Sequence, residues 1–392
     1  MKKINQWLMS FARKNSVFYG LPVLLIYLLF SAMACTFYID PPPPCPVKSD
    51  LSLVQPYFSG AQLVWSFHED QIAVTTSRKR IYLVSANPQN IVQSYQTVPN
   101  QGWNISWSPD GERIVFSERG QDTELIMTAF EISTGVLTKI PLNSLDQKFR
   151  NNTIVHYLLA NDHSQLLLTR RRDPLLLGRT QYDFFLVDLL SNPPNSRLVA
   201  THDAVVAAWS PDLTTILLSS QHDVKGKFNP DAGYKLVAID VSSGDKRQFT
   251  TARGCQQDPS WSQDNTQVAY SSSQDNNWDI FVTSLTDGTI ENITNTPDQD
   301  EFQPDWSPDG QYIAYVAFNS YAGTGTQDIF VYNIAKGYSI NLTNGSGRVD
   351  TPVWSPSGNH IAFMAFDSSE GKWHLEIIKP DGTGRTRLAP LP

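Results

Sequence analysis

The sequence predicts an all-β fold made of seven similar units, and two periodic features carry this prediction. Six of the ten tryptophans occupy one position of a repeat. With a degenerate seventh copy at Leu159, the anchor positions are Trp65, Trp107, Leu159, Trp209, Trp261, Trp306 and Trp354. Seven residues after each anchor an apolar triplet begins, at Ile72, Ile114, Leu166, Ile216, Val268, Ile313 and Ile361. A second apolar run, a glycine turn and a last short strand complete each unit of roughly 48 residues.

Four strands per unit predict a single β-propeller of seven blades over residues 51–392, with six blades as the alternative. An isolated four-stranded sheet cannot bury both of its faces, so blades must pack face to face around an axis. The aromatic anchors are expected to fill the space between blades.

An N-terminal signal peptide or apolar anchor helix is predicted for residues 1–39. Four basic and no acidic residues lie within residues 1–16, and the run from Val17 to Ile39 holds no charge. This pattern places the downstream chain outside the cytoplasm. Three forms stay open: an uncleaved membrane anchor, cleavage after the Ala-Met-Ala site that ends at Ala34, and a lipoprotein acylated at Cys35, since Ala-Met-Ala-Cys resembles a bacterial lipobox.

Residues 40–50 are expected to form a spacer. Four consecutive prolines, Pro41 to Pro44, favour a stiff polyproline II segment. Cys45 follows them, and we consider two states for it: a disulfide with Cys255 that straps the spacer to the propeller, or a free thiol.

Composition and motifs argue against several classes of function. The formal net charge of −8 disfavours nucleic acid as a partner. The three cysteines form no Cys-x-x-Cys pair, and the sequence lacks the common zinc-protease, serine-hydrolase and phosphate-loop signatures. We therefore predict no catalytic residues, no metal and no cofactor.

Two sets of recurring aspartates are interpreted as structural. Pro, Asp and Gly after a tryptophan anchor are turn residues, which accounts for Asp110, Asp212 and Asp309. Aspartates that begin the third strand of a unit are expected to be hydrogen-bonding partners at the strand end: Asp183, Asp279 and Asp328.

Candidate binding residues lie on the opposite face from the Ser-Pro-Asp-Gly turns, in the loops that lead into each first strand. Loops on a rigid scaffold often carry binding, and the units differ most in sequence here. The candidates are Trp103, Asn104, His202, Asp203, Arg253, Gln256, Asp258, Asp300, Glu301, Gln303, Arg348 and Asp350. For each one, a solvated loop residue is the alternative. A leucine triplet at Leu175–Leu177 is either a partner contact or packs back on the propeller.

The Trp-Ser-Pro-Asp-Gly units resemble those of the TolB family of bacterial propeller proteins, and also the propellers of prolyl-oligopeptidase-like enzymes, over roughly residues 55–389. The resemblance implies the propeller fold and, through TolB, a module that binds a protein or peptide. We expect neither the α/β domain of TolB nor the hydrolase domain of the peptidases in this chain.

These observations predict an exported, membrane-tethered and monomeric propeller on the periplasmic or cell-surface side of a bacterium. We expect it to bind a protein or peptide on its loop-rich face and not to be an enzyme. Two alternatives remain: a hydrolase or lyase with paired carboxylates at the channel mouth, acting on peptide or saccharide, and a structural envelope protein.

Overall fold

The computed structural model of this chain describes only part of the sequence. The described residues are 62–66, 71–75, 81–86, 93–95, 105–107, 112–119, 125–141, 154–159, 165–171, 182–188, 195–202, 207–220, 233–250, 254–275, 277–319, 326–345 and 347–390. The chain divides into two compact units, Met1–Pro43 and Pro44–Pro392, and every described residue belongs to the second. The predicted signal segment, the spacer, Cys35 and Cys45 lie outside the described residues. Among the described residues, no helix is long and apolar enough to span a bilayer.

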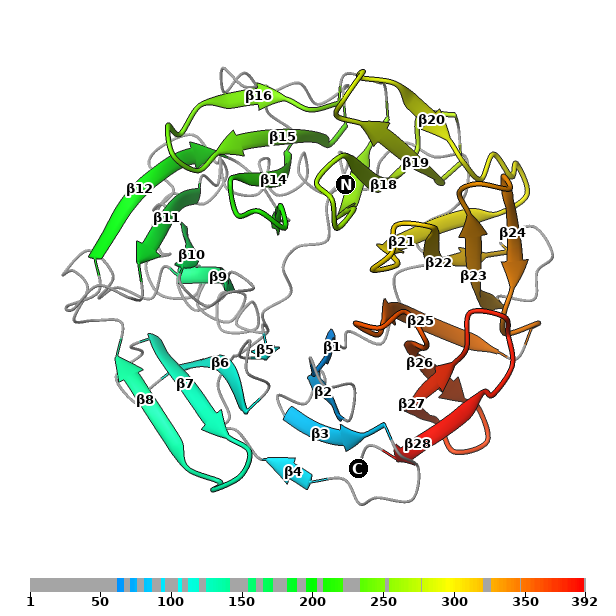
Figure 1. Ribbon diagram of the computed structural model, residues 1–392, viewed down its shortest axis with the longest axis horizontal. Helices are drawn as coiled ribbons and strands as arrows, with labels where there is room; N and C mark the ends of the chain where they lie inside the picture. Colours follow the sequence, from blue (N-terminus) through cyan, green and yellow to red (C-terminus); the bar gives the residue numbers. More distant parts are fainter. Residues whose placement is uncertain are drawn as a thin grey trace, which may run out of the picture. The chain divides into compact units, whose positions relative to one another are not determined.

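Seven four-stranded antiparallel sheets form a ring in the second unit (Figure 1). Each sheet is one blade, made of four consecutive strands that are ordered from the centre of the ring outward, and the blades are numbered 1 to 7 in chain order. The innermost strands are β1 (Gln62–Trp65), β5 (Ile105–Trp107), β9 (Ile154–Leu159), β13 (Ala207–Trp209), β17 (Gln256–Trp261), β21 (Asp300–Trp306) and β25 (Arg348–Trp354). The second strands are β2 (Gln71–Thr75), β6 (Arg113–Arg119), β10 (Gln165–Arg171), β14 (Thr215–Ser220), β18 (Gln267–Ser272), β22 (Tyr312–Phe318) and β26 (Ile361–Asp367).

The outer half of each blade is equally regular. The third strands are β3 (Ile81–Ser85), β7 (Leu125–Glu131), β11 (Tyr182–Asp188), β15 (Lys235–Asp240), β19 (Asp279–Ser284), β23 (Gln327–Asn333) and β27 (Lys372–Ile378). The outermost strands are β4 (Gln93–Tyr95), β8 (Leu137–Pro141), β12 (Asn195–His202), β16 (Lys246–Gln248), β20 (Ile290–Asn292), β24 (Tyr338–Asn341) and β28 (Thr386–Pro390). The predicted seven blades are thus confirmed, including the unit whose first strand ends at Leu159.

The core of the ring lies between the blades. Six hydrophobic clusters of buried side chains each join two neighbouring blades. The cluster between blades 6 and 7, for example, packs Val316 and Ile329 of one sheet against Trp354 and Phe363 of the next. At each of these six junctions the two sheets cover each other's facing side, as the repeat requires.

The tryptophan anchors connect adjacent blades by hydrogen bonds as well as by packing. The indole Nε1 of Trp107 donates to the carbonyl oxygen of Val64 at 3.0 Å, and that of Trp354 donates to Asp305 at 3.1 Å. In both pairs the acceptor is the residue just before the tryptophan of the preceding blade. The repeat therefore places a donor and an acceptor at a fixed offset on successive blades.

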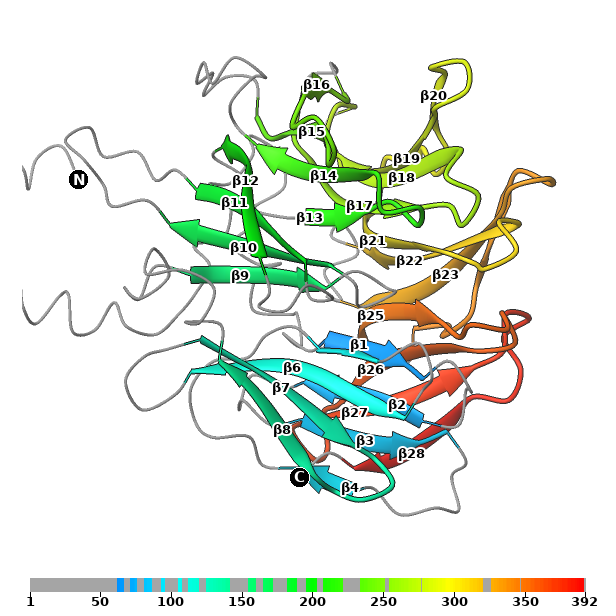
Figure 2. The same ribbon diagram turned by 60° about the vertical axis from the view of Figure 1, so that its left-hand side comes forward.

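The ring closes between blade 7 and blade 1 by the same bond. The indole Nε1 of Trp65 donates to the carbonyl oxygen of Val353 at 3.1 Å, although the two residues are 288 positions apart. Leu63 and Tyr82 of blade 1 share a hydrophobic cluster with Met364 of blade 7. No described sheet combines strands from both ends of the propeller, so this seam depends on side-chain packing and this bond (Figure 2).

The Ser-Pro-Asp-Gly segments form the predicted turns between first and second strands. Ser307 Oγ donates to Asp309 Oδ1 at 2.6 Å, and the same Oδ1 accepts the backbone N–H of Gln311 at 3.0 Å. Gly310 has φ 68°, which glycine adopts without steric cost. Asp212 makes the corresponding bonds to Ser210 and Thr214, while Asp110 lies outside the described residues.

We predict that Trp306→Ala lowers the free energy of unfolding by about 3 to 5 kcal/mol, because a large buried aromatic side chain is lost. Asp309→Ala in the adjoining turn is the matched control and should cost only about 0.5 to 1 kcal/mol for its turn bonds. Urea unfolding followed by tryptophan fluorescence measures both losses. Equal losses would contradict the separate roles of anchor and turn.

Candidate functional site

The innermost strands of blades 5, 6 and 7 share an irregularity. Each has a β-bulge, at Gln257/Ser260, Phe302/Asp305 and Asp350/Val353. In each strand a proline stands two residues before the tryptophan anchor: Pro259, Pro304 and Pro352. Proline has no N–H for the strand ladder, so pairing is interrupted where it occurs.

The residue before each of these prolines has a left-handed backbone. Asp258 has φ 53°, Gln303 has φ 55° and Thr351 has φ 56°. This conformation is uncommon for residues other than glycine, and for a β-branched residue such as Thr351 it is a clear outlier. Strained backbone that recurs on adjacent elements suggests a functional position.

Side chains at the bulges bond to the backbone of the next blade. The Asp258 carboxylate accepts the backbone N–H of Gln303, and Gln303 Oε1 accepts the N–H of Thr351 at 3.0 Å. Two residues further along, Ser260 Oγ accepts the N–H of Trp306 at 3.3 Å, and Asp305 Oδ2 accepts that of Trp354 at 2.8 Å. Polar side chains at the bulges thus hydrogen-bond each inner strand to the inner strand of the next blade.

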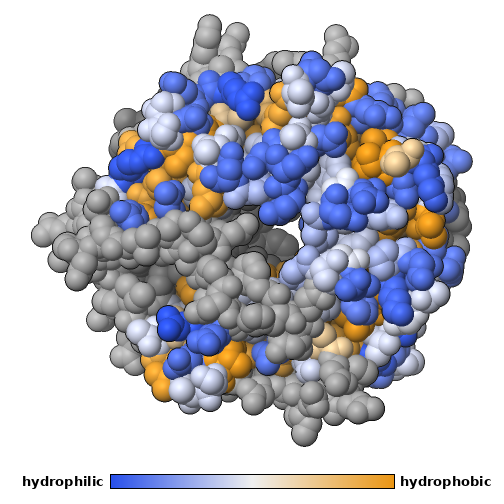
Figure 3. All heavy atoms as spheres, viewed as in Figure 1, coloured by the Kyte–Doolittle hydropathy of each residue, from blue (hydrophilic) through white to orange (hydrophobic). Residues whose placement is uncertain are grey.

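We call these residues, together with Asp350, the inner cluster: Asp258, Ser260, Gln303, Asp305, Asp350 and Thr351. They belong to the three innermost strands β17, β21 and β25, which face the centre of the ring. Figure 3 shows an opening at this centre, with hydrophilic side chains over the surrounding described face.

Two carboxyl groups of the inner cluster have strongly raised pKa values. Burial raises the pKa of Asp258 to about 6, and the neighbouring carboxylate of Asp350 adds to the rise, while the Gln303 N–H and the Ser271 hydroxyl oppose it. Burial also raises the pKa of Asp305 to about 7, against the opposing bond from Trp354. Both groups therefore exchange protons near neutral pH.

Glu301 next to the inner cluster has a different environment. It is fully buried, and burial raises its pKa to about 9. Its carboxyl group is bonded to the hydroxyl groups of Thr296 and Thr294 and lies beside Asp279, whose negative charge adds to the rise. All these partners sit at the strand end of blade 5, so Glu301 fixes the contact between blades 5 and 6.

The strand-end role predicted for the recurring aspartates is confirmed. Asp183 accepts a bond from Thr201 at 2.7 Å, and Asp328 accepts from Thr343 at 2.6 Å and from the backbone N–H of Gly345 at 2.7 Å. The Asp183 bond holds the end of the outermost strand β12, and the Asp328 bonds hold the loop that follows β24.

The predicted binding residues divide into three groups. Trp103, Asn104, Asp203 and Arg253 lie outside the described residues, as does the leucine triplet 175–177. His202 ends β12, but its side chain is not described. The structure brings the remaining seven together on β17, β21 and β25: Gln256, Asp258, Asp300, Glu301, Gln303, Arg348 and Asp350.

The expectation that these seven residues lie in loops is wrong. The strands begin earlier than predicted, because Gln256, Asp300 and Arg348 already pair with Ser272, Phe318 and Phe366 of the second strands. Gln256, Asp300, Glu301 and Asp350 are moreover buried, whereas Asp258, Gln303 and Arg348 are half-buried. The last three are therefore the ones placed to touch a ligand directly.

Sequence reasoning missed Ser260, Asp305 and Thr351. A signal was present, since x-Pro-x-Trp recurs in three consecutive units at a fixed distance from the anchor. Proline inside an otherwise regular strand pattern indicates a bulge or an edge strand.

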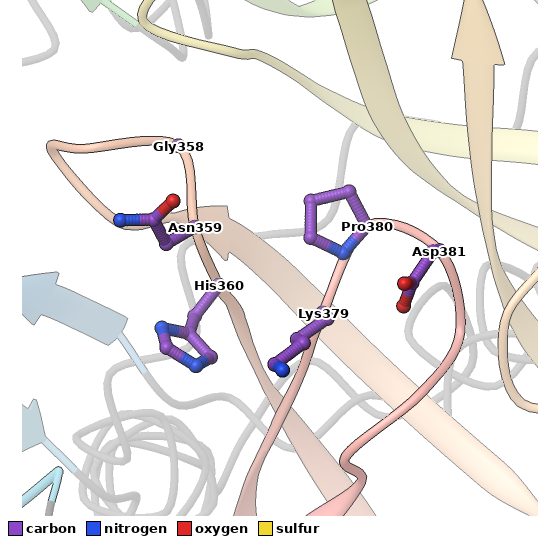
Figure 4. Close-up of a pocket in the computed structure, with 6 residues that line it drawn as sticks. All are labelled: Gly358, Asn359, His360, Lys379, Pro380 and Asp381. Carbon is purple, nitrogen blue, oxygen red and sulfur yellow. The ribbon is translucent and has the colours of Figure 1, made fainter.

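A pocket of about 510 Å³ lies at the other end of blade 7. Gly358, Asn359, His360, Lys379, Pro380 and Asp381 line it, and Figure 4 shows them on two adjacent turns. The Asp381 carboxylate already accepts the N–H and hydroxyl of Thr383, at 2.9 and 2.7 Å. The pocket lies beside the turn that connects the first and second strands of blade 7, and it is separate from the inner cluster.

One group of side chains in the described residues has ligand atoms close enough for a metal ion: Asp367, Glu370 and His374. Arg387 on β28 contacts all three, with salt bridges to Asp367 at 3.2 Å and Glu370 at 2.9 Å. The Arg387 guanidinium therefore supplies the positive charge beside these three side chains.

Part of the chain matches a known family. Residues 210–322, which include three strands of blade 4, all of blade 5 and two strands of blade 6, match the Dipeptidyl peptidase IV (DPP IV) N-terminal region. No curated protein sequence matches the chain.

Several solved structures are similar to the chain at low sequence identity. A puromycin-hydrolyzing peptidase from Mycobacterium tuberculosis has a TM-score of 0.62 and 11% identity, over 88% of this chain and 56% of that chain. An oligogalacturonate lyase from Vibrio parahaemolyticus has a TM-score of 0.58 and 12% identity, over 86% and 90%. TolB from Acinetobacter baumannii has a TM-score of 0.49 and 15% identity, over 84% and 79%. The first two likenesses support the propeller fold.

The comparisons correct one prediction. We expected the chain not to be an enzyme, yet residues 210–322 match the N-terminal region of a peptidase, and the similar structures include peptidases and a lyase. The comparisons therefore point toward enzyme activity.

We predict that Asp305→Asn makes the free energy of unfolding less dependent on pH between about 4 and 7. In that range Asp305 is protonated in the folded chain and ionised in the unfolded one, so wild-type stability falls as pH rises. The slopes of the two proteins should differ by up to about 1.4 kcal/mol per pH unit. The asparagine oxygen can still accept the Trp354 N–H.

Urea unfolding at several pH values measures this difference. Gln311→Ala, in the exposed turn of the same blade, removes no titratable group and should keep the wild-type slope. Parallel curves for Asp305→Asn and wild type would show that Asp305 ionises normally.

Proposed function

We propose that this propeller is a hydrolase or lyase that uses acid–base chemistry at the inner cluster. The observation that carries the proposal is Asp258, a half-buried carboxyl group on a strained bulge, with a pKa raised to about 6. A group that titrates near the working pH is effective as a general acid or base. The peptidase-family match and the lyase and peptidase structures of similar fold agree with this reaction class.

Asp258 would be the reacting group, and the buried Asp350 beside it would act on its proton affinity. Two carboxyl groups close together do not ionise independently, and the negative charge of Asp350 helps to keep a proton on Asp258. A carboxyl group that gains and loses a proton near the working pH can donate a proton to a leaving group or accept one from water or from a carbon acid. Cleavage of a peptide or glycosidic bond can use such a step.

The surrounding residues would position the substrate. Gln303 Oε1 accepts the Thr351 N–H and holds two bulges in register, and the Gln303 N–H fixes the direction of the Asp258 carboxylate. Arg348, at the start of β25, lies 5.7 Å from the ring centre of Phe366 and is half-buried. A cation on an aromatic face at the end of the same strand as Asp350 suits a substrate with a carboxylate, such as a peptide terminus or an acidic sugar.

We further propose that the chain acts outside the cytoplasm of a bacterium, in the periplasm or at the cell surface, tethered through residues 1–39. The basic flank and the uncharged run of that segment support this location. Cys255 adds an independent argument, because it is disulfide-bonded and disulfides persist in oxidising compartments.

Binding of a protein or peptide partner at the same face is the second candidate function. Arg348 and Phe366 at this face are both half-buried, and the guanidinium carbon lies 5.7 Å from the ring centre. Aromatic residues and arginine are enriched at protein interfaces. A peptide retained without turnover would favour this function.

We predict that Asp258→Asn lowers kcat at least about 100-fold on any peptide or oligosaccharide that the wild-type protein cleaves. Asparagine is nearly isosteric and tolerates a left-handed backbone, so the fold should be preserved. Assays of product formation on a panel of both substrate classes, across pH 4 to 9, should show a limb with an apparent pKa near 6.

Asp264→Asn is the matched control. Asp264 lies on the same blade, in the exposed turn at the opposite end of the first strand, where it accepts bonds from Ser262 and Thr266. This variant should retain full activity. Full turnover by Asp258→Asn, or a wild-type protein that cleaves nothing in the panel, would overturn the proposal.

A further inference from the structure

Cys255 is held in a disulfide whose partner lies outside the described residues. It stands directly before β17, three residues from Asp258, and is fully buried. The structure records it as disulfide-bonded. The chain contains two other cysteines, Cys35 and Cys45, so within one chain the partner must be one of them.

The backbone around Cys255 is arranged about its sulfur. Sγ accepts the backbone N–H of Tyr234 at 3.4 Å, and the Cys255 N–H donates to Ser273 Oγ at 2.9 Å. Gly233 and Gly254 both have positive φ, and a Cβ atom on Gly233 would lie 3.0 Å from Sγ and 2.7 Å from the Gly254 carbonyl oxygen. Residues larger than glycine do not fit there, so the sulfur position is fixed by two loops at once.

We infer that Cys45 is the partner and that the bond straps the N-terminal spacer to blade 5 beside the inner cluster. Cys35 belongs to the uncharged run Val17–Ile39, whereas Cys45 follows the polar and proline-rich start of the spacer. Cys35 is not available to a buried cysteine of the folded domain where it lies in a membrane anchor or is acylated. Cys45 is available to form the bond in all three forms of the N-terminus considered above.

Chain length permits the strap. Gln62, the first residue of β1, is 17 positions after Cys45, and an extended chain of that length reaches about 56 Å. The first strands of blades 1 and 5 enter from the same face, because each ends at its tryptophan anchor, and the serine after the anchor accepts the N–H of the first residue of the second strand. The strap therefore connects the blade 5 and blade 1 sides of the face that bears Asp258.

Formation of the bond is an oxidation. Two thiols lose two protons and two electrons, which pass to the disulfide of a thiol–disulfide oxidoreductase in an oxidising compartment. The inference does not depend on catalysis by the propeller, and it holds equally for a binding protein.

Mass spectrometry of the full chain, expressed for export and alkylated without reduction, tests the inference. Cleavage before aspartate releases Asp40–Ser49, which contains only Cys45, and Asp245–Gln257, which contains only Cys255. We expect these two peptides to be recovered as one linked species that separates on reduction. Linkage of Cys255 to Cys35, linkage between two chains, or two alkylated free thiols would each overturn it.

Thermal unfolding supplies a second readout. Cys45→Ser should lower Tm by about 5 °C, and reduction of the wild-type protein should lower it equally. Cys35→Ser is the matched control and should leave both Tm and the linked peptide unchanged. Cys45 precedes the first strand of the propeller, so its substitution does not disturb the packing around Cys255. An unchanged Tm in Cys45→Ser, together with a missing linked peptide in the wild type, would refute the strap.

Discussion

The hydrogen bond from a tryptophan indole to the carbonyl oxygen of the preceding blade is the interaction on which the ring depends. It occurs between blades 1 and 2, between blades 6 and 7, and across the seam from blade 7 to blade 1. The aromatic ring supplies buried area, and the N–H fixes its direction and therefore the angle between sheets. The described Trp306 finds no acceptor for its indole N–H, and at that junction Ser260 Oγ of blade 5 accepts the backbone N–H of Trp306.

The inner cluster is a consequence of the prolines in the innermost strands of blades 5 to 7. Proline two residues before the anchor removes a backbone donor and forces a bulge, and the residues on either side of the proline then bond to the next blade. Carboxyl groups used in this way are partly removed from water, and burial raises the pKa values of Asp258 and Asp305. The same local change that adjusts the packing of blades 5 to 7 thus generates groups that exchange protons near neutral pH.

Sequence reasoning found the fold because the anchor and the apolar triplet report burial directly, even for the unit that has Leu159 in place of tryptophan. It found the turns for the same reason, since Ser307 and Asp309 act within a few residues of each other. The candidate site depends instead on contacts between blades. Asp258 and Asp350 are 92 positions apart, and no spacing rule reveals that the charge of one acts on the other. The assignment of site residues to loops failed because strand pairing continues past the positions where sequence variation begins.

Every sheet of the ring is made from one uninterrupted stretch of sequence. A blade can therefore be copied or lost at the gene level as a single in-frame segment, without dividing a sheet between the two ends of the coding region. The new unit would bring its own tryptophan donor and its own carbonyl acceptor, so both of its junctions would already be complementary. Variation in blade number between related proteins is then a matter of recombination between repeats rather than of redesign at the seam.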